Sequence, residues 1–106
     1  MKVCAKTGLV VDIKGTGPAT KGKEECHNVA IRADMDGLPI PENNPDLPYK
    51  SKTDWAHMCG HDGHMAMLLA AAQIFGKYRK NIPSNKTIRL LWQPAEESPG
   101  GALPMI

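Results

Sequence analysis

Cysteine, aromatic residues and net charge are all scarce in this sequence, and each shortage excludes a class of protein. The 106 residues include three cysteines, Cys4, Cys26 and Cys59, and carry a formal net charge of +2. An odd number of widely spaced cysteines does not form the disulfide framework of a small secreted domain, so we expect free thiols. Two Trp, two Tyr and one Phe, with scattered lysines, do not predict a nucleic-acid-binding surface.

Long apolar runs are also missing. No stretch approaches the ~20 residues that a membrane-spanning helix needs, and residues 1–4 are not followed by the apolar core of a secretory signal. We therefore expect a cytoplasmic protein with no membrane partner. A hydrophobic content of 42% and a charged content of 23% are ordinary for a globular protein, and the length allows one small domain.

The hydrophobic pattern predicts an α/β fold. Apolar and β-branched runs at 9–13, 28–36 and 88–92 predict strands. A helix is predicted between the last two strands, starting near Gly63 with Asp62 as its cap and stopping before Pro83. Its broad apolar face, which indicates burial against a sheet, comprises Met65, Met67, Leu68, Leu69, Ala71, Ala72, Ile74 and Phe75. If the first two strands pair as a hairpin, Cys4 and Cys26 fall out of register for a disulfide.

The segment His57–His64 concentrates three imidazoles, a thiol and a carboxylate in eight residues. Zinc and neighbouring transition metals prefer Cys sulfur and His nitrogen as ligands. In an extended segment His57, Cys59 and His61 would project to one side, and Gly60 would let the backbone turn tightly. The composition therefore favours a metal site over a loop that carries unrelated Cys and His residues.

A second segment, Gln93–Glu97, follows the last predicted strand. Pro94 cannot donate a hydrogen bond to a sheet, so it should end the strand and start a loop. The adjacent carboxylates of Glu96 and Glu97 should point in different directions. One could then bind a metal ion while the other faces the substrate as a general base. Alone, such a pair is typical of a solvated loop; beside a Cys/His cluster it becomes a candidate site.

Three motifs, in this order, resemble the amidohydrolase branch of the aminoacylase and carboxypeptidase metallopeptidases. They are IRADMDGLPI at 31–40, CGHDGH at 59–64 and QPAEE at 93–97. The branch includes hippurate hydrolase, N-acyl-amino-acid amidohydrolases and auxin-conjugate hydrolases. The resemblance extends from about Thr7 to the last residue. It implies a mixed sheet flanked by helices, as part of the catalytic domain of a zinc-peptidase-like α/β/α fold.

The resemblance also implies a role for each residue of the site. Cys59, His61 and Glu97 would bind a divalent transition metal, Zn or Mn with Co or Ni as alternatives, and full-length relatives hold two ions per site. Glu96 would be the general base that accepts a proton from the attacking water. Asp36 would orient or electrostatically support the site without binding the metal.

The reaction implied is metal-dependent hydrolysis of the amide bond of small N-acyl amino acids, such as hippurate or aminoacyl conjugates. Relatives are several times longer, with a dimerisation domain and two further metal-binding His residues, whereas no His follows His64 here. We therefore expect residues 1–106 to form a single partial catalytic domain without the dimerisation domain or the carboxyl-terminal part of the fold. Such a chain should not hydrolyse acyl-amino acids alone, unless a homo-oligomer completes its site.

Two other hypotheses remain open from the sequence. One is a non-catalytic truncated remnant or interaction protein of the same ancestry. The other is a small zinc-knuckle-like module built on Cys59, His61 and His64, with His57 or Cys26 as a fourth ligand and no role for Glu96. Family resemblance instead favours His64 as a hydrogen-bond donor behind the ligands.

Overall fold

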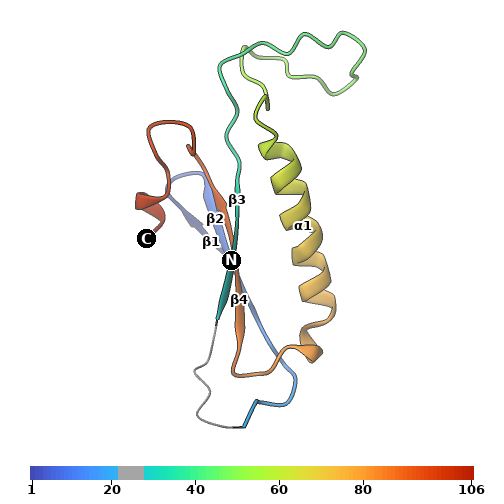
Figure 1. Ribbon diagram of the computed structural model, residues 1–106, viewed down its shortest axis with the longest axis vertical. Helices are drawn as coiled ribbons and strands as arrows, with labels where there is room; N and C mark the ends of the chain where they lie inside the picture. Colours follow the sequence, from blue (N-terminus) through green and yellow to red (C-terminus); the bar gives the residue numbers. More distant parts are fainter. Residues whose placement is uncertain (22–27) are drawn as a thin grey trace.

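The computed structural model in Figure 1, which describes residues 1–21 and 28–106, contains a four-stranded mixed sheet with one long helix along one face. The helix, α1, spans His61–Lys77, and the strands are β1 (Lys2–Cys4), β2 (Gly8–Lys14), β3 (Val29–Asp34) and β4 (Thr87–Gln93). Short 3-10 turns follow at η1 (Arg79–Asn81) and η2 (Leu103–Met105). The strand order is β1-β2-β4-β3. Among the strand pairs of the described residues, β3–β4 is parallel and the other two are antiparallel.

The predicted mixed α/β fold is confirmed, whereas the first two predicted strands do not pair as the hairpin that was considered for them. The three predicted strands and the helix correspond to β2, β3, β4 and α1. β4 lies between β2 and β3, because α1 carries the chain across the sheet so that β4 can run parallel to β3. The short β1 was not predicted, since three residues are too few to show alternation. Cys4 lies on this strand, whereas Cys26 lies outside the described residues.

The parallel pairing of β3 with β4 determines where the site forms. Asp34 stands opposite Gln93 in this pair, and the N–H of Met35 donates to the Gln93 carbonyl at 2.9 Å. Both strands therefore end at the same edge of the sheet. Residues that follow them in sequence meet there, as ligand-binding residues do in open α/β sheets.

The helix begins two residues earlier than predicted. Gly60 precedes it with φ of 86°, a left-handed conformation that favours glycine, and its carbonyl accepts from the N–H groups of Gly63 and His64. The prediction of Asp62 as the cap is wrong, because this residue lies within the first turn. Its carboxylate there still interacts favourably with the positive end of the helix dipole. The early start makes His61 the first helical residue.

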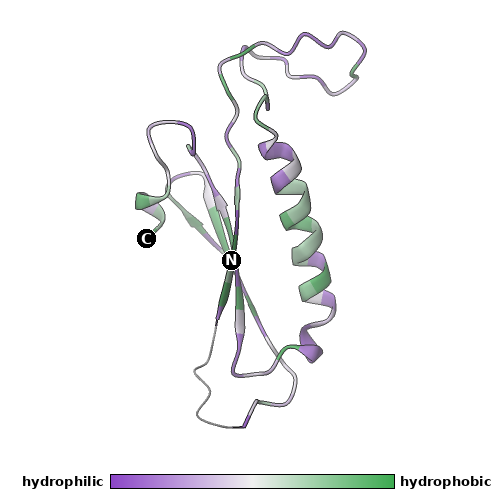
Figure 2. Ribbon diagram, viewed as in Figure 1, coloured by the Kyte–Doolittle hydropathy of each residue, from purple (hydrophilic) through white to green (hydrophobic). Residues whose placement is uncertain are grey.

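Helix α1 packs on the sheet through a narrower stripe than the sequence suggested. Leu68 is buried with Ala33 and Leu90 at the centre of the core. The apolar side chains partly buried around them are Val11, Ile13, Ile31, Ala72, Phe75, Ile88 and Trp92. Met67 and Ile74, by contrast, are 65% and 56% exposed. Hydrophobic residues line the middle turns of α1 in Figure 2, so apolar surface extends beyond the packed stripe.

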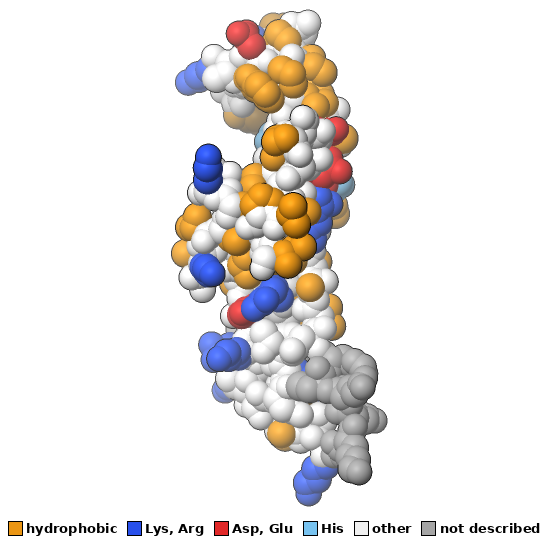
Figure 3. All heavy atoms as spheres, turned by 90° about the vertical axis from the view of Figure 1, so that its left-hand side faces the viewer, with side chains coloured by type: hydrophobic (Ala, Val, Ile, Leu, Met, Phe, Trp, Pro, Cys, Tyr) orange, Lys and Arg blue, Asp and Glu red, His pale blue; other side chains and the backbone are white. Residues whose placement is uncertain are grey.

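The molecule is elongated. Its extents are 55 × 30 × 19 Å and its radius of gyration is 17.1 Å, compared with about 13 Å for a compact domain of similar length. Figure 3 shows hydrophobic side chains gathered in the middle of the face that carries β1 and the carboxyl-terminal segment. Val3 and Leu103, on these elements, are 65% and 79% exposed. Within residues 1–21 and 28–106, no helix has the length and apolar character needed to cross a membrane.

Candidate metal centre

His61 lies at the centre of the site. Its side chain is buried at the start of α1, and its Nδ1 is 3.0 Å from the backbone oxygen of Asp36. A carbonyl oxygen can only accept a hydrogen bond, so Nδ1 carries the proton and the other ring nitrogen, Nε2, keeps a free lone pair. Metal-binding histidines usually have this arrangement, because the hydrogen bond fixes both the tautomer and the ring orientation.

Carboxylates surround the free nitrogen of His61. The distances from Nε2 are 3.8 Å to an oxygen of Asp34, 3.9 Å to Glu97 and 4.0 Å to Glu96. Zinc bonds to nitrogen and oxygen are ~2.0–2.2 Å long, so two ligands of one ion are at most about 4.4 Å apart. The spacing between His61 and Glu97 is therefore compatible with an ion between them.

Cys59 joins these two residues from the exposed side. Ligand atoms of Cys59, His61 and Glu97 all lie within 4.8 Å of one another. A hydrogen bond to the Glu97 carboxylate raises the pKa of the Cys59 thiol, and the negative charges of Glu97 and Glu96 raise it further. The structure thus brings together the three predicted ligands, in surroundings that favour a bound cation over an isolated thiolate.

The two adjacent glutamates converge, contrary to the expectation that they point apart. Both carboxylates lie within 4.0 Å of His61 Nε2. The segment after Pro94 is a looped turn and not an extended chain: Ala95 has φ of 52°, and its carbonyl accepts from the N–H of Gly101, six residues later, at 2.8 Å. Side chains alternate in an extended segment, not in such a turn. Proximity to Cys59 distinguishes Glu97 from Glu96.

Asp36 ties the two halves of the site together. Its Oδ2 accepts from the Glu97 N–H at 3.1 Å, while its Oδ1 is 3.3 Å from His61 Nδ1 and is buried without a hydrogen-bond partner among the described residues. Burial raises the pKa of Asp36, but hydrogen bonds from the Glu97 and Glu96 backbone outweigh it, so the pKa is lowered. An ionised Asp36 therefore contacts both the ring of His61 and the loop that carries the glutamates.

His57, the third imidazole of the 57–64 segment, lies apart from this group. It lines a different cavity of about 500 Å³ together with Tyr49, Trp55 and Asp62. In the part of the chain that the structure describes, His57 belongs to no cluster of potential metal ligands. The left-handed turn at Gly60 and the helix that follows break the alternation on which the prediction of a shared side depended.

The described residues do not form the proposed zinc knuckle. Its two outer members fall in separate clusters: Cys59 lies with His61 and Glu97, whereas His64 lies with His61 and Asp34. The candidate fourth ligand Cys26 lies outside the described residues. A closed site on one ion would need Cys59 and His64 in the same group.

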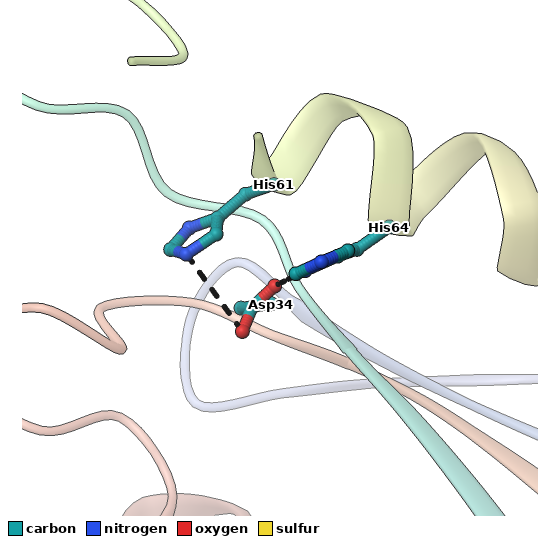
Figure 4. A group of neighbouring side chains, drawn as sticks. All are labelled: Asp34, His61 and His64. Carbon is teal, nitrogen blue, oxygen red and sulfur yellow. Dashed lines mark hydrogen bonds and ion pairs between the residues drawn. The ribbon is translucent and has the colours of Figure 1, made fainter. Parts of the chain in front are cut away.

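Asp34, for which the sequence predicts no separate role, is the most connected polar residue of the site. It is buried, and its Oδ1 is 2.6 Å from His64 Nδ1 (Figure 4). Its Oδ2 is 3.1 Å from Arg32 Nη1. Burial raises the pKa of Asp34, but the His64 hydrogen bond and the nearby His61 outweigh it, so the pKa is lowered. Its position two residues before Asp36 was the available signal, because such residues share one side of an extended chain.

The chain is similar to known proteins of one family. The family model described as Peptidase family M20/M25/M40 matches residues 30–106. Thermostable carboxypeptidase 1 of Saccharolobus solfataricus is 50% identical over 103 residues, which cover 94% of this chain and 24% of that protein. The N-acyl-L-amino acid amidohydrolase of Geobacillus stearothermophilus is 51% identical over 87 residues, covering 80% of this chain and 23% of that protein.

A solved structure shares the fold. The crystal structure of the Bacillus subtilis YXEP protein, a dinuclear metal-binding peptidase from the M20 family, matches with a TM-score of 0.68 and 37% identity. The match covers 85% of this chain and 23% of that one. This chain therefore spans about a quarter of the length of the relatives it matches.

Proposed function

Because this chain belongs to Peptidase family M20/M25/M40, we propose that residues 1–106 are part of the catalytic domain of a metal-dependent amidohydrolase that releases the free amino acid from N-acyl amino acids. The convergence of Cys59, His61 and Glu97, with Glu96 beside them, carries this proposal. The radius of gyration supports the assignment as part of a domain, since a complete domain of this length would be more compact. The cytoplasmic location stays a prediction.

A divalent transition metal fits the donors present. One thiol, one imidazole with a free Nε2 and one carboxylate form the set that zinc prefers, and manganese shares the nitrogen and oxygen donors. Cys59, His61 and Glu97 would hold the ion. When bound, such an ion supplies Lewis acidity toward the amide carbonyl and lowers the pKa of water.

Glu96 is the proposed general base. Its carboxylate lies 4.0 Å from His61 Nε2, on the same side as Glu97, and its side chain is 39% exposed, so substrate and water can reach it. Glu96 accepts a proton from the attacking water and then gives it to the departing amine. Asp36 holds His61 and the Glu97 backbone in place during both steps. The products are a carboxylic acid and a free amino acid.

The choice of N-acyl amino acids over peptides is supported by the relative named N-acyl-L-amino acid amidohydrolase. The similar identity to a carboxypeptidase favours peptides as a second candidate. Both are amides next to a free carboxylate, so the same chemistry serves either one. The residues at the site do not bear on the difference, which makes substrate comparison part of the test.

The test is a chimera in which residues 1–106 replace the matching segment of the Geobacillus stearothermophilus amidohydrolase. We expect Zn²⁺- or Mn²⁺-dependent release of amino acid from hippurate and N-acetyl amino acids, faster than from dipeptides. The Glu96→Gln variant should lose this activity and keep its metal. A folded, metal-loaded chimera that hydrolyses neither class would overturn the proposal. Activity of the 106-residue chain alone would indicate that a homo-oligomer completes the site.

A further inference from the structure

Building on the proposed function, we propose that Asp34 and His64 are positioning residues that hold the His61 ring in its metal-binding orientation, without binding the ion. We call these two residues the Asp34–His64 pair. The observation that carries the inference is the short contact between His64 Nδ1 and Asp34 Oδ1, beside the His61 imidazole that belongs to both clusters of candidate ligands. Figure 4 shows Asp34 between the two rings, linked to both.

The position of Asp34 is fixed by the sheet. It is the last residue of β3, opposite Gln93 of β4, and only 6% of its surface is exposed. Arg32 bridges the two strands, since its Nε donates to Gln93 at 2.9 Å and its Nη1 to Asp34 at 3.1 Å. A carboxylate held in this way has little freedom to move. It therefore forms a fixed point from which the start of α1 can be oriented.

His64 carries that constraint to His61. Its Nδ1 faces Asp34 at 2.6 Å, a distance at which the imidazole N–H donates and the carboxylate accepts. The His64 ring stacks on the His61 ring, with centroids 5.8 Å apart and planes inclined by 25°. The two residues are neighbours on the helix surface because they are three positions apart. His61 is thus restrained by Asp36 at Nδ1 and by the Asp34–His64 pair beside its ring.

The same three residues could in principle hold an ion themselves, since ligand atoms of Asp34, His61 and His64 also lie within 4.8 Å of one another. Two features argue against it. The short contact already occupies Nδ1 of His64 and one oxygen of Asp34, and an ion there would have to break a charge-assisted hydrogen bond. His61 has one free lone pair, on Nε2. If Nε2 bound an ion held by Asp34 and His64, it could not also bind the ion held by Cys59 and Glu97 in the proposed centre.

The test measures Co²⁺ binding to the 106-residue chain, with the metal alone as the probe. His64→Ala and Asp34→Asn should each weaken Co²⁺ binding by about 10- to 100-fold, the range for residues that orient a ligand. The double variant should lose little more than either single one, because the two residues act as a unit. The thiolate-to-cobalt absorption should remain in all three, since Cys59 still binds. His64→Asn, which keeps an N–H near the Nδ1 position, should partly restore the affinity.

Controls separate this role from the alternatives. His57 is exposed and belongs to neither cluster of potential metal ligands among the described residues, so His57→Ala should leave the Co²⁺ affinity unchanged. His64 is exposed, so its replacement should preserve folding, which thermal unfolding of the metal-free variants checks. If the variants of the Asp34–His64 pair melted at lower temperature but bound Co²⁺ with unchanged affinity, the pair would have only a structural role, and the inference would be overturned. Loss of the absorption band in His64→Ala, or additive losses in the double variant, would also overturn it. Absence of Co²⁺ binding by the wild type would instead overturn the proposed function and this inference with it.

Discussion

Two regions of this sheet differ in how the negative charge of their carboxylates is balanced. On the sheet surface, Asp12 of β2 stands opposite Arg89 of β4, and both of its oxygens accept from the guanidinium, at 2.7 and 2.8 Å. At the edge where β3 and β4 end, four carboxylates lie within 4.0 Å of one imidazole, that of His61.

The charge of Asp12 is balanced by Arg89, whereas the carboxylates at the sheet edge concentrate negative charge around a single imidazole. A protein gains little stability from the second arrangement, because like charges at short distance repel each other. The arrangement becomes favourable when a cation is bound. The surplus of negative charge at the sheet edge, compared with the balanced pair on the sheet surface, therefore indicates a cation site, and the perturbed pKa values of Asp34, Asp36 and Cys59 at that edge agree with it.

The largest effect is expected from removing the His61 imidazole, around which the four carboxylates of the sheet edge gather. His61→Ala should lower Zn²⁺ affinity by at least ~10²-fold, more than any substitution behind the ligands, because it deletes the one nitrogen donor of the centre. Isothermal titration of Zn²⁺ into the 106-residue chain measures this loss. Cys59→Ala and Glu97→Ala should also weaken binding strongly, and His57→Ala serves as the matched control. Equal affinity in His61→Ala and His57→Ala would contradict the assignment of the centre.

The second prediction separates the converging glutamates. In the chimera described above, Glu96→Gln should reduce turnover by ~10²-fold or more while metal content is retained, because an amide keeps the shape of the side chain but cannot accept the proton. Glu97→Gln should lower metal content first. Metal analysis beside initial rates distinguishes the two outcomes. A fully active Glu96→Gln variant would exclude Glu96 as the base.

Sequence analysis identified the elements better than their arrangement. The presence of β2, β4 and α1 follows from apolar, β-branched runs and from helical spacing, which are local properties. The place of β4 between β2 and β3 depends on pairings between distant segments, and no local pattern encodes it. The start of α1 depended on the left-handed conformation of Gly60, a choice that the sequence allows but does not require.

The site shows the same division. The ligand types and their order could be predicted because the two segments are short and chemically distinctive. The convergence of Glu96 with Glu97 could not, since it depends on a turn closed by a hydrogen bond from Gly101 to the Ala95 carbonyl. The Asp34–His64 contact joins residues thirty positions apart. Only the folded chain brings such residues together.

The third prediction compares the two sides of α1. Leu68 is 3% exposed against the core, whereas Met67, its neighbour in sequence, is 65% exposed. Leu68→Ala should lower the free energy of unfolding by about 2–5 kcal/mol, through lost burial and the cavity left behind. Met67→Ala should change it by less than about 0.5 kcal/mol. Urea unfolding of both variants measures the difference. Equal effects would mean that the outer side of the helix is covered in solution, for example by association of chains.

The smallest expected effect tests the balanced pair on the sheet surface. Hydrogen bonds from Arg89 hold the pKa of Asp12 below its usual value of ~3.9. A carboxyl group whose pKa is lower in the folded state contributes stability above its unfolded pKa, and that contribution disappears as the pH falls through the folded pKa. Asp12→Asn should therefore be slightly less stable than the wild type at pH 7, and the two should converge toward pH 2. Salt should shrink the gap at pH 7, because both side chains are more than one-third solvent-exposed. Urea unfolding at the two pH values, with and without added salt, measures it. A difference that persists at pH 2 would mean that Asp12 acts through packing and not through its charge. The Asp12–Arg89 pair could then no longer be compared, as a balanced pair of charges, with the carboxylates around His61.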